Sequence, residues 1–100
     1  MTSLWFSRRA LADLERFSTF LLEQEPANAT STMEGILNGV EILRRHPHVG
    51  RPVGHGLREL VISRGRSGYV ALYAFDAVRD EITVHKLRHQ LEAGDPDDGP

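Results

Sequence analysis

Basic and aromatic residues that could bind or cleave nucleic acid are concentrated in the second half of this sequence. The set consists of Arg58, Arg64, Arg66, Tyr69, Tyr73, Lys86, Arg88 and His89. An arginine guanidinium matches a phosphate through paired hydrogen bonds, and a tyrosine ring can stack on a nucleobase. RNA cleavage without a metal needs a base for the 2′-hydroxyl, an acid for the leaving oxygen and cations for the developing charge. Part of that set could come from His89 with Arg58, Arg64 and Arg88, so contact with a nucleic acid or an acidic protein is one interpretation.

The same residues also have a purely structural interpretation. Tyr73 lies in a stretch that is apolar on both faces, where a tyrosine is more often part of the core than a stacking platform. Lys86 and Arg88 could protect an edge strand from aggregation. Residues 44–66 contain six arginines and a single acid, Glu59, for which we expect an ion pair on the sheet. Such a basic zone either binds an anionic partner or forms a solvated surface, and both interpretations stay open at this point.

Metal and cofactor sites find little support. The proline in His46-Pro47-His48 restricts the geometry of a metal-binding pair, and no carboxylate lies nearby in the sequence. His85 and His89 would lie on the same face of a strand about 13 Å apart, too far to share one ion. The chain contains no cysteine, which excludes a disulfide scaffold, a thiolate metal site and a cysteine nucleophile. We therefore predict neither a metal nor a cofactor.

Length and composition narrow the class of protein. The chain has 100 residues, enough for one domain, with 40% apolar and 26% charged residues, as in globular proteins. Its longest apolar run, Tyr69–Phe75, is far shorter than the roughly 20 residues of a membrane helix. Because the N-terminus also lacks the pattern of a signal peptide, we expect a soluble cytoplasmic protein that makes no membrane contact. Residues 92–100 carry four acids and no base, and we expect them to form a mobile acidic tail after a single domain over residues 1–91.

The elements that must position these residues begin with a strand and a helix. Thr2–Phe6 is short and apolar, which is typical of a strand, and Ser7 can cap a helix over Arg8–Gln24. The apolar stripe of this helix is Ala10, Leu14, Phe17 and Leu21. Asp13, with Glu15 and Arg16, falls largely off that stripe, so we expect it on the solvent side.

A second helix follows after two or three residues, which makes the helices antiparallel neighbours. Pro26 suits its first turn, and His46-Pro47 ends it after about Arg45. Its apolar stripe is Met33, Ile36, Leu37, Val40 and Leu43. Gly35 and Gly39 lie one turn apart and indicate close approach to another element.

The second half predicts a loop and three strands. His46–Gly56 is rich in proline and glycine and reads as a loop. The predicted strands are Leu57–Ser63, Tyr69–Phe75 in the centre of the sheet, and Glu81–His89, joined by turns at residues 64–68 and 76–80. In the last strand we expect Ile82, Val84 and Lys86 on one face and Thr83, His85 and Leu87 on the other. The predicted fold is therefore α+β in the order β-α-α-β-β-β, with a helical hairpin on one face of a small, mostly antiparallel sheet. The other face or its rim is left for function.

Six segments in this order resemble the RelE/ParE superfamily of type II toxin–antitoxin toxins. They are WFSRRALADL at 5–14, EPANA at 25–29, LRRHPHVGRP at 43–52, LRELV at 57–61, GYVALY at 68–73 and LRHQ at 87–90. The resemblance covers about residues 4 to 94. It implies a small toxin, of the kind that stabilises plasmids, held in a hetero-oligomer by a cognate antitoxin whose C-terminal segment wraps and masks it. We expect the antitoxin contacts on the first helix and at the sheet edge, with Leu11, Leu14, Phe17 and Leu21 as the helix residues.

The resemblance leaves the cellular target open between two classes. Members of the RelE type cut messenger RNA on the ribosome, and members of the ParE type act on DNA gyrase. Here Val70 stands where the RNA-cleaving pattern tends to have an arginine, and the tail lacks a C-terminal tyrosine. With the net charge of −2, this favours a gyrase-directed toxin without catalysis. The expected target-binding residues are Arg58, Arg64, Arg66, Tyr73, Arg88 and His89.

Two alternatives remain. In a ribosome-dependent endoribonuclease, Arg58, Arg64, Arg88 and His89 would be the catalytic residues. In a non-toxic binding module, the poison function would have been lost.

Overall fold

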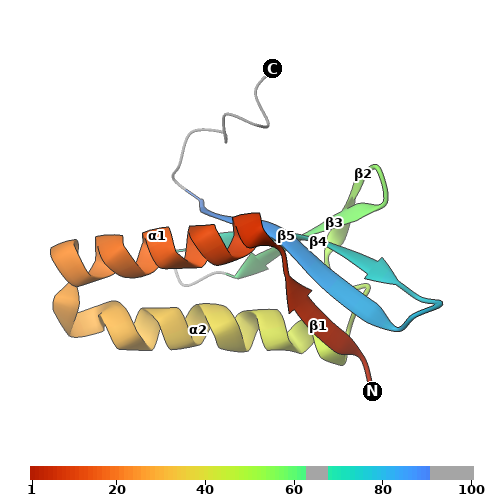
Figure 1. Cartoon of the computed structure of the whole chain (residues 1–100), viewed down its shortest axis with the longest axis horizontal. Coiled ribbons are helices and arrows are strands. Elements are labelled where there is room, and N and C mark those ends of the chain that lie inside the picture. The colour runs from red at the N-terminus through yellow and green to blue at the C-terminus, as the bar shows by residue number, and fades with distance from the viewer. Residues whose placement is uncertain (63–67, 91–100) are drawn as a thin grey trace.

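The computed structural model describes residues 1–62 and 68–90. Its elements are β1 (Ser3–Phe6), α1 (Arg8–Gln24), η1 (Pro26–Asn28), α2 (Ala29–Glu41), η2 (Ile42–Arg44), β2 (Arg51–Gly54), β3 (Leu57–Ile62), β4 (Tyr69–Asp76) and β5 (Glu81–His89). The helices α1 and α2 lie side by side as a hairpin that extends beyond the sheet, while η1 and η2 are short 3-10 turns at the two ends of α2 (Figure 1). In these residues no helix is long and apolar enough to span a membrane.

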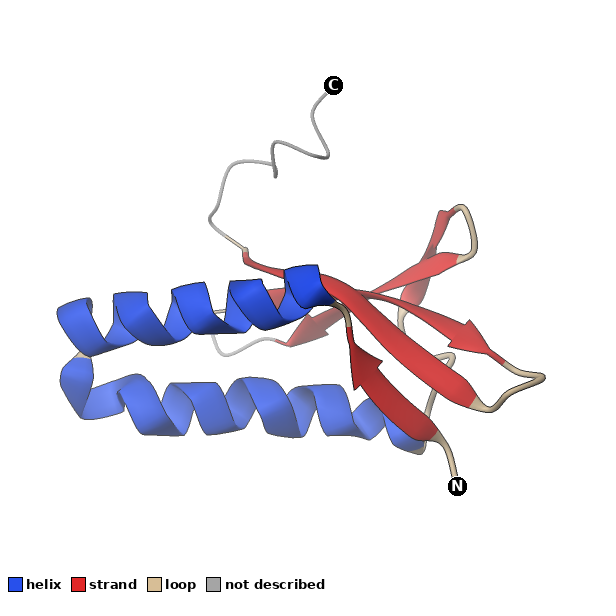
Figure 2. Ribbon diagram, viewed as in Figure 1, coloured by secondary structure: helices blue, strands red, loops and turns tan. Residues whose placement is uncertain are grey.

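The strands of the described residues form one sheet in the order β1-β5-β4-β3-β2 (Figure 2). β1 pairs with β5 in parallel, and the other neighbours pair antiparallel. The hairpin packs on one face, so the predicted α+β class and the central position of β4 are confirmed. The opposite face of the sheet, called the open face below, carries side chains that alternate with those of the core.

Local signals explain α1 well. The Ser7 hydroxyl accepts a hydrogen bond from the Ala10 N–H at 3.0 Å, as an N-cap residue should, and the helix has the predicted bounds. Ala10, Phe17 and Leu21 are buried, and Leu14 packs partly against the core. The expectation for Asp13 is wrong, since this carboxylate is only 3% exposed. Its buried position is possible because charged and polar partners surround it, as described below.

The second helix follows the prediction except at its two ends and at two of its residues. The regular helix ends at Glu41, and the 3-10 turn η2 continues it to Arg44. Pro26 opens the 3-10 turn η1, and α2 itself begins at Ala29. Leu37 is exposed, although Ile36, Val40 and Leu43 are buried as expected. A Cβ atom at Gly39 would lie 2.7 Å from Cγ2 of Ile62 on β3, so the predicted close approach is confirmed at this glycine. At Gly35 a Cβ atom would meet nothing within 4 Å, and the prediction is wrong there.

Two features of the sheet differ from the prediction. Residues 51–54 of the expected loop form the edge strand β2, which pairs with β3 as far as Glu59. The proline and glycine residues of β2 favour a loop in a prediction from sequence, but an edge strand can contain both. In β5, Val84 pairs with Tyr73 and Lys86 pairs with Leu72, so His85 is an extra, bulged residue.

The bulge reverses the alternation of side chains in the second half of β5. Leu87 therefore joins Ile82 and Val84 in the core, and the predicted grouping of Lys86 with these two residues is wrong. It also puts His85 and His89 out of the same-face relation that the sequence predicted.

Candidate functional site

Arg58 is committed to the structure of a loop. Its guanidinium donates hydrogen bonds to the carbonyl oxygens of His48 at 3.1 Å and Gly50 at 2.7 Å. It stands opposite Tyr73 in the register, on the side of the sheet that faces the core. These bonds hold the chain between η2 and β2, so a role in target binding would compete with them.

Arg88 lies on the open face beside a carboxylate. It stands opposite Val70 of β4, and its guanidinium is 3.8 Å from Oε2 of Glu59. Oε1 of Glu59 accepts a hydrogen bond of 3.0 Å from Arg51, so the predicted ion pair of Glu59 is confirmed. Lys86 stands opposite Leu72 in the neighbouring row of the same face. We name Glu59 and the three basic residues of this face, Arg51, Lys86 and Arg88, the open-face cluster.

His89 lies on the opposite side of the sheet from Arg88. It stands opposite Tyr69, and the two rings meet edge to face with centroids 5.0 Å apart. The Tyr69 ring also packs against Phe17 of α1 at 4.9 Å. His89 therefore belongs to the rim of the core, next to the helical hairpin.

Tyr73 is a core residue. Its side chain is fully buried, and its hydroxyl donates to the Pro47 carbonyl at 2.8 Å and accepts from the Gly50 N–H at 2.9 Å. A ring in this position offers no surface to a target, which agrees with the structural interpretation of Tyr73.

Among the residues that the structure describes, the predicted basic side chains do not come together. Arg58 and Arg88 stand opposite β4 residues that are three positions apart, about 10 Å along the strand, and on different faces. His89 faces the hairpin. Arg64 and Arg66, and the predicted tail over residues 92–100, lie outside the described residues.

The helix residues predicted to bind an antitoxin are divided between core and surface. Phe17 and Leu21 are buried and unavailable to a partner, and Leu14 is half-buried, whereas Leu11 is 54% exposed. Leu22, which lies three helical turns further along α1, is also exposed.

A groove between α2 and β3 offers a second apolar surface. Its volume is about 440 Å³, and it is lined by Gly35, Asn38, Gly39, Ile42, Leu60, Val61 and Ile62. Ile42 and Val61 are 49% and 48% exposed. We name this hollow the α2–β3 groove.

A comparison with models of known protein families identifies the family of this chain. The model of the ParE toxin of the type II toxin–antitoxin system parDE matches residues 4–94. The chain belongs to the ParE toxin family. It is thus a type II toxin of the RelE/ParE superfamily, as the resemblance of its six segments implied.

Two toxins of Caulobacter vibrioides are similar to this ParE-family chain over nearly its full length. Toxin RelE3 is 34% identical over 92 residues, which cover 92% of this chain and 98% of that protein. Toxin RelE1 is 31% identical over 86 residues, which cover 86% of this chain and 90% of that protein.

Two solved structures share the fold of the ParE-family chain. A chain of the chromosomal ParDE toxin–antitoxin system from P. aeruginosa superposes with a TM-score of 0.76 at 25% identity, over 89% of this chain and 96% of that one. A chain of the toxin–antitoxin complex RelBE2 from Mycobacterium tuberculosis has a TM-score of 0.58 at 20% identity, over 91% of this chain and 93% of that one. The second likeness concerns the fold alone.

Sequence reasoning missed several residues of the ParE-family chain that the structure makes prominent. The sequence places Arg51 in a loop, and its position beside Glu59 follows only from the β2–β3 pairing. Ile42 falls in the predicted second helix but off its apolar stripe, and this position was a usable signal that its side chain is exposed. Asp13 had no sequence signal, since its partner on β5 is 74 residues away.

In residues 1–62 and 68–90, no group of three or more histidine and acidic side chains could hold a metal ion.

Proposed function

We propose that this toxin inhibits growth by binding DNA gyrase, without chemistry of its own. The observation that carries the proposal is the dispersal of the described basic residues. Arg58 is bonded to backbone carbonyls, Arg88 faces Glu59, and His89 lies on the other side of the sheet. General acid–base cleavage of RNA needs its groups within hydrogen-bond reach of one substrate, and a dispersed set favours a toxin that acts by binding.

The open-face cluster is the proposed contact with gyrase. Arg51 and Arg88 flank Glu59, and Lys86 adds a third base on the same face, opposite Leu72. Arginine is enriched in the residues that dominate protein–protein interfaces. The net charge of −2 also suits a protein target better than the phosphate-rich ribosome.

Supercoiling of relaxed plasmid by purified gyrase tests the proposal. We expect the toxin to inhibit the reaction, and Arg88→Ala to raise the half-inhibitory concentration by about tenfold or more. Arg79→Ala is the matched control, because Arg79 is an exposed arginine in the β4–β5 turn, and it should leave inhibition unchanged. Full gyrase activity at a large molar excess of toxin would refute the proposal.

We further propose that a cognate antitoxin covers the α2–β3 groove and the exposed leucines of α1. The P. aeruginosa relative comes from a ParDE toxin–antitoxin system, which supports a partner of this kind. Ile42 and Val61 expose apolar surface on both walls of the groove, and such surface marks a contact with another protein. An amphipathic segment of the antitoxin fits a hollow of this shape.

Titration of the toxin with the product of the adjacent reading frame tests this contact. Ile42→Glu or Val61→Glu should weaken binding by at least about tenfold, because each puts a charge into an apolar contact. The control is Val78→Glu at the exposed β4–β5 turn, which should bind as the wild type does. Equal affinities for all three variants would place the antitoxin elsewhere.

The second candidate function is a ribosome-dependent endoribonuclease. Its support is that two relatives are named RelE toxins and that this chain has a histidine, His89, at the end of β5. In that case primer extension on messages after induction should show new 5′ ends, which His89→Ala should abolish. An unchanged message profile removes this candidate. Growth that is unaffected by expression without an antitoxin would instead favour the non-toxic binding module.

A further inference from the structure

The edge of β5 that faces β1 and α1 receives its hydrogen bonds from β1 in its first half and from Ser7 and α1 in its second half. β1 pairs with β5 only as far as Phe6 and Val84, and β5 continues to His89. At that point the chain turns into α1, and Ser7 donates its backbone N–H to the Val84 carbonyl at 2.9 Å and its hydroxyl to the His85 carbonyl at 2.7 Å. Two consecutive carbonyls therefore point to the same edge, which is the mark of the bulge.

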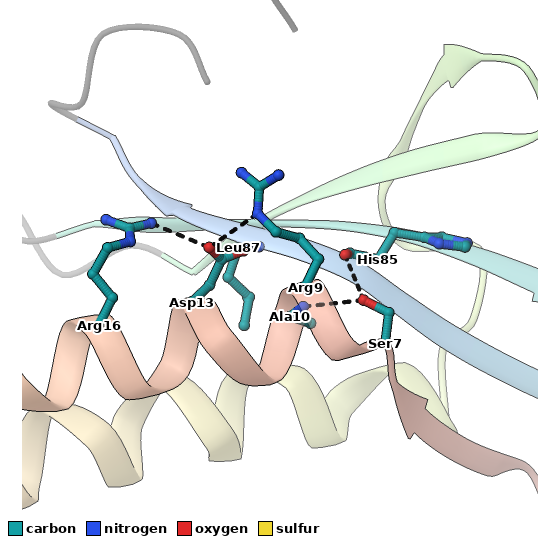
Figure 3. A network of polar contacts seen from close by, with 7 residues as sticks. All are labelled: Ser7, Arg9, Ala10, Asp13, Arg16, His85 and Leu87. Atoms are coloured by element: carbon teal, nitrogen blue, oxygen red, sulfur yellow. Dashed lines mark hydrogen bonds and ion pairs between the residues drawn. The ribbon is translucent and has the colours of Figure 1, made fainter. Parts of the chain in front are cut away.

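Asp13 supplies the next bond along this edge. Its Oδ2 accepts the Leu87 N–H at 2.9 Å, so a carboxylate of α1 takes the place of a strand carbonyl (Figure 3). Its Oδ1 lies 3.2 Å from Nε of Arg9 and 3.3 Å from a terminal nitrogen of Arg16. Figure 3 shows these two arginines on either side of the carboxylate. Burying a carboxylate is costly unless it is paired and bonded on its remaining lone pairs, and here both conditions are met.

The hydrogen bond from the Leu87 N–H to Asp13 lies in the part of β5 after the bulge, where the alternation of side chains is reversed. Leu87 is fully packed in the core, and its neighbour Arg88 points to the open face beside Glu59. Residues 85–89 have β4 as a strand partner on one side and, on the other, the bonds from Ser7 and Asp13. A slip of one residue here would exchange the faces of Arg88 and His89.

We propose that Asp13 is a positioning residue that holds the end of β5 in register and thereby presents Arg88 on the open face. The part of this inference that concerns target binding rests on the proposed function, and the part that concerns β5 does not. Asp13 touches no target itself and acts through Leu87 and Arg88.

Amide hydrogen exchange in the full chain tests the structural part. In Asp13→Leu, exchange at Leu87 should rise about 10- to 100-fold relative to Ile82, which is paired with strands on both sides. Asp13→Asn keeps a carbonyl oxygen and should restore the ratio to within a few-fold of the wild type. Glu15→Leu on the exposed side of α1 is the control and should leave the ratio unchanged. Equal acceleration at Leu87 and Ile82 would mean that Asp13 only adds to global stability, and would overturn the proposal.

A measurement on the unaltered chain covers the case in which Asp13→Leu does not fold. A scalar coupling across the hydrogen bond, from the Leu87 amide nitrogen to the Asp13 carboxyl carbon, should be detectable by NMR. Its absence under conditions that reveal the backbone couplings of β4 and β5 would also overturn the proposal.

A double-mutant cycle on gyrase inhibition tests the functional part. If Asp13 acts through Arg88, Asp13→Leu should lose inhibition on its own and add little to Arg88→Ala. Additive losses would overturn the link between the two residues. Should the wild type fail to inhibit gyrase, the proposed function falls, while the exchange experiment still decides whether Asp13 holds β5.

Discussion

The contact between Gly39 and Ile62 predicts opposite effects for one substitution at two glycines of α2. A Cβ at Gly39 would lie 2.7 Å from Cγ2, 3.1 Å from Cγ1 and 3.5 Å from Cβ of Ile62. Because Cγ2 is bonded directly to Cβ, the clash cannot be relieved at the flexible end of the side chain. A Cβ at Gly35 meets nothing within 4 Å.

The expected magnitudes follow from two opposing terms. Replacing a helical glycine by alanine stabilises a helix by about 0.5–1 kcal/mol. Overpacking typically costs about 1–3 kcal/mol. We therefore expect Gly35→Ala to raise the free energy of unfolding by about 0.5–1 kcal/mol and Gly39→Ala to lower it by about 0.5–2 kcal/mol.

Urea denaturation of the two variants and the wild type measures the difference. For a domain of this size, a change of 1 kcal/mol corresponds to roughly 4–8 °C in Tm, so thermal melting provides a second measurement. In an Ile62→Ala background the clash is removed, and Gly39→Ala should then stabilise as Gly35→Ala does. Equal stability of Gly39→Ala and Gly35→Ala in the presence of Ile62 would show that the Cβ of residue 39 does not clash with Ile62.

Substitutions at four further residues test the packing that holds the site. Tyr73→Phe should cost about 2–3 kcal/mol in urea denaturation, because it removes two hydrogen bonds and leaves the buried Gly50 N–H without its partner; a loss below about 0.5 kcal/mol would contradict the loop anchoring. Ser7→Ala should cost about 1–2 kcal/mol through the lost helix cap and the lost bond to His85, and Ser7→Thr should retain most of that stability in thermal melts. Phe17→Ala should lower the free energy of unfolding by about 3–5 kcal/mol, whereas Leu11→Ala should stay within about 0.5 kcal/mol of the wild type. Similar losses for both variants would contradict the burial of Phe17 and the exposure of Leu11.

The bounds of α1 and the central place of β4 could be predicted because their signals are local. Ser7 caps the helix, the apolar stripe recurs at helical spacing, and Pro26 follows directly after its end. Tyr69–Asp76 is apolar on both faces over most of its length, which suits a strand with a neighbour on each side. For the same reason, six short segments in the right order were enough to indicate the family.

The details of the candidate site depend on groups that are distant in the sequence. Strand β2 forms because β3 pairs with it, whereas Pro52 and Gly54 favour a loop when the sequence is considered alone. Arg58 and Arg88 both lie in the second half of the sequence. The β3–β4 register puts Arg58 on the core side of the sheet, and the bulge at His85 puts Arg88 on the open face.

Hydrophobic periodicity and helix capping act over a few residues, so the positions of the helices and the central strands follow from the sequence alone. The burial of Asp13, and the choice of which of Arg88 and His89 faces the helical hairpin, depend instead on tertiary contacts. Burial of a carboxylate is acceptable only where a remote partner compensates it, and the face of a strand residue is set by its pairing. The Leu87 N–H that donates to Asp13 and the Pro47 carbonyl that accepts from the Tyr73 hydroxyl both lie far away in the sequence. The residues next to Asp13 and Tyr73 therefore do not reveal these partners.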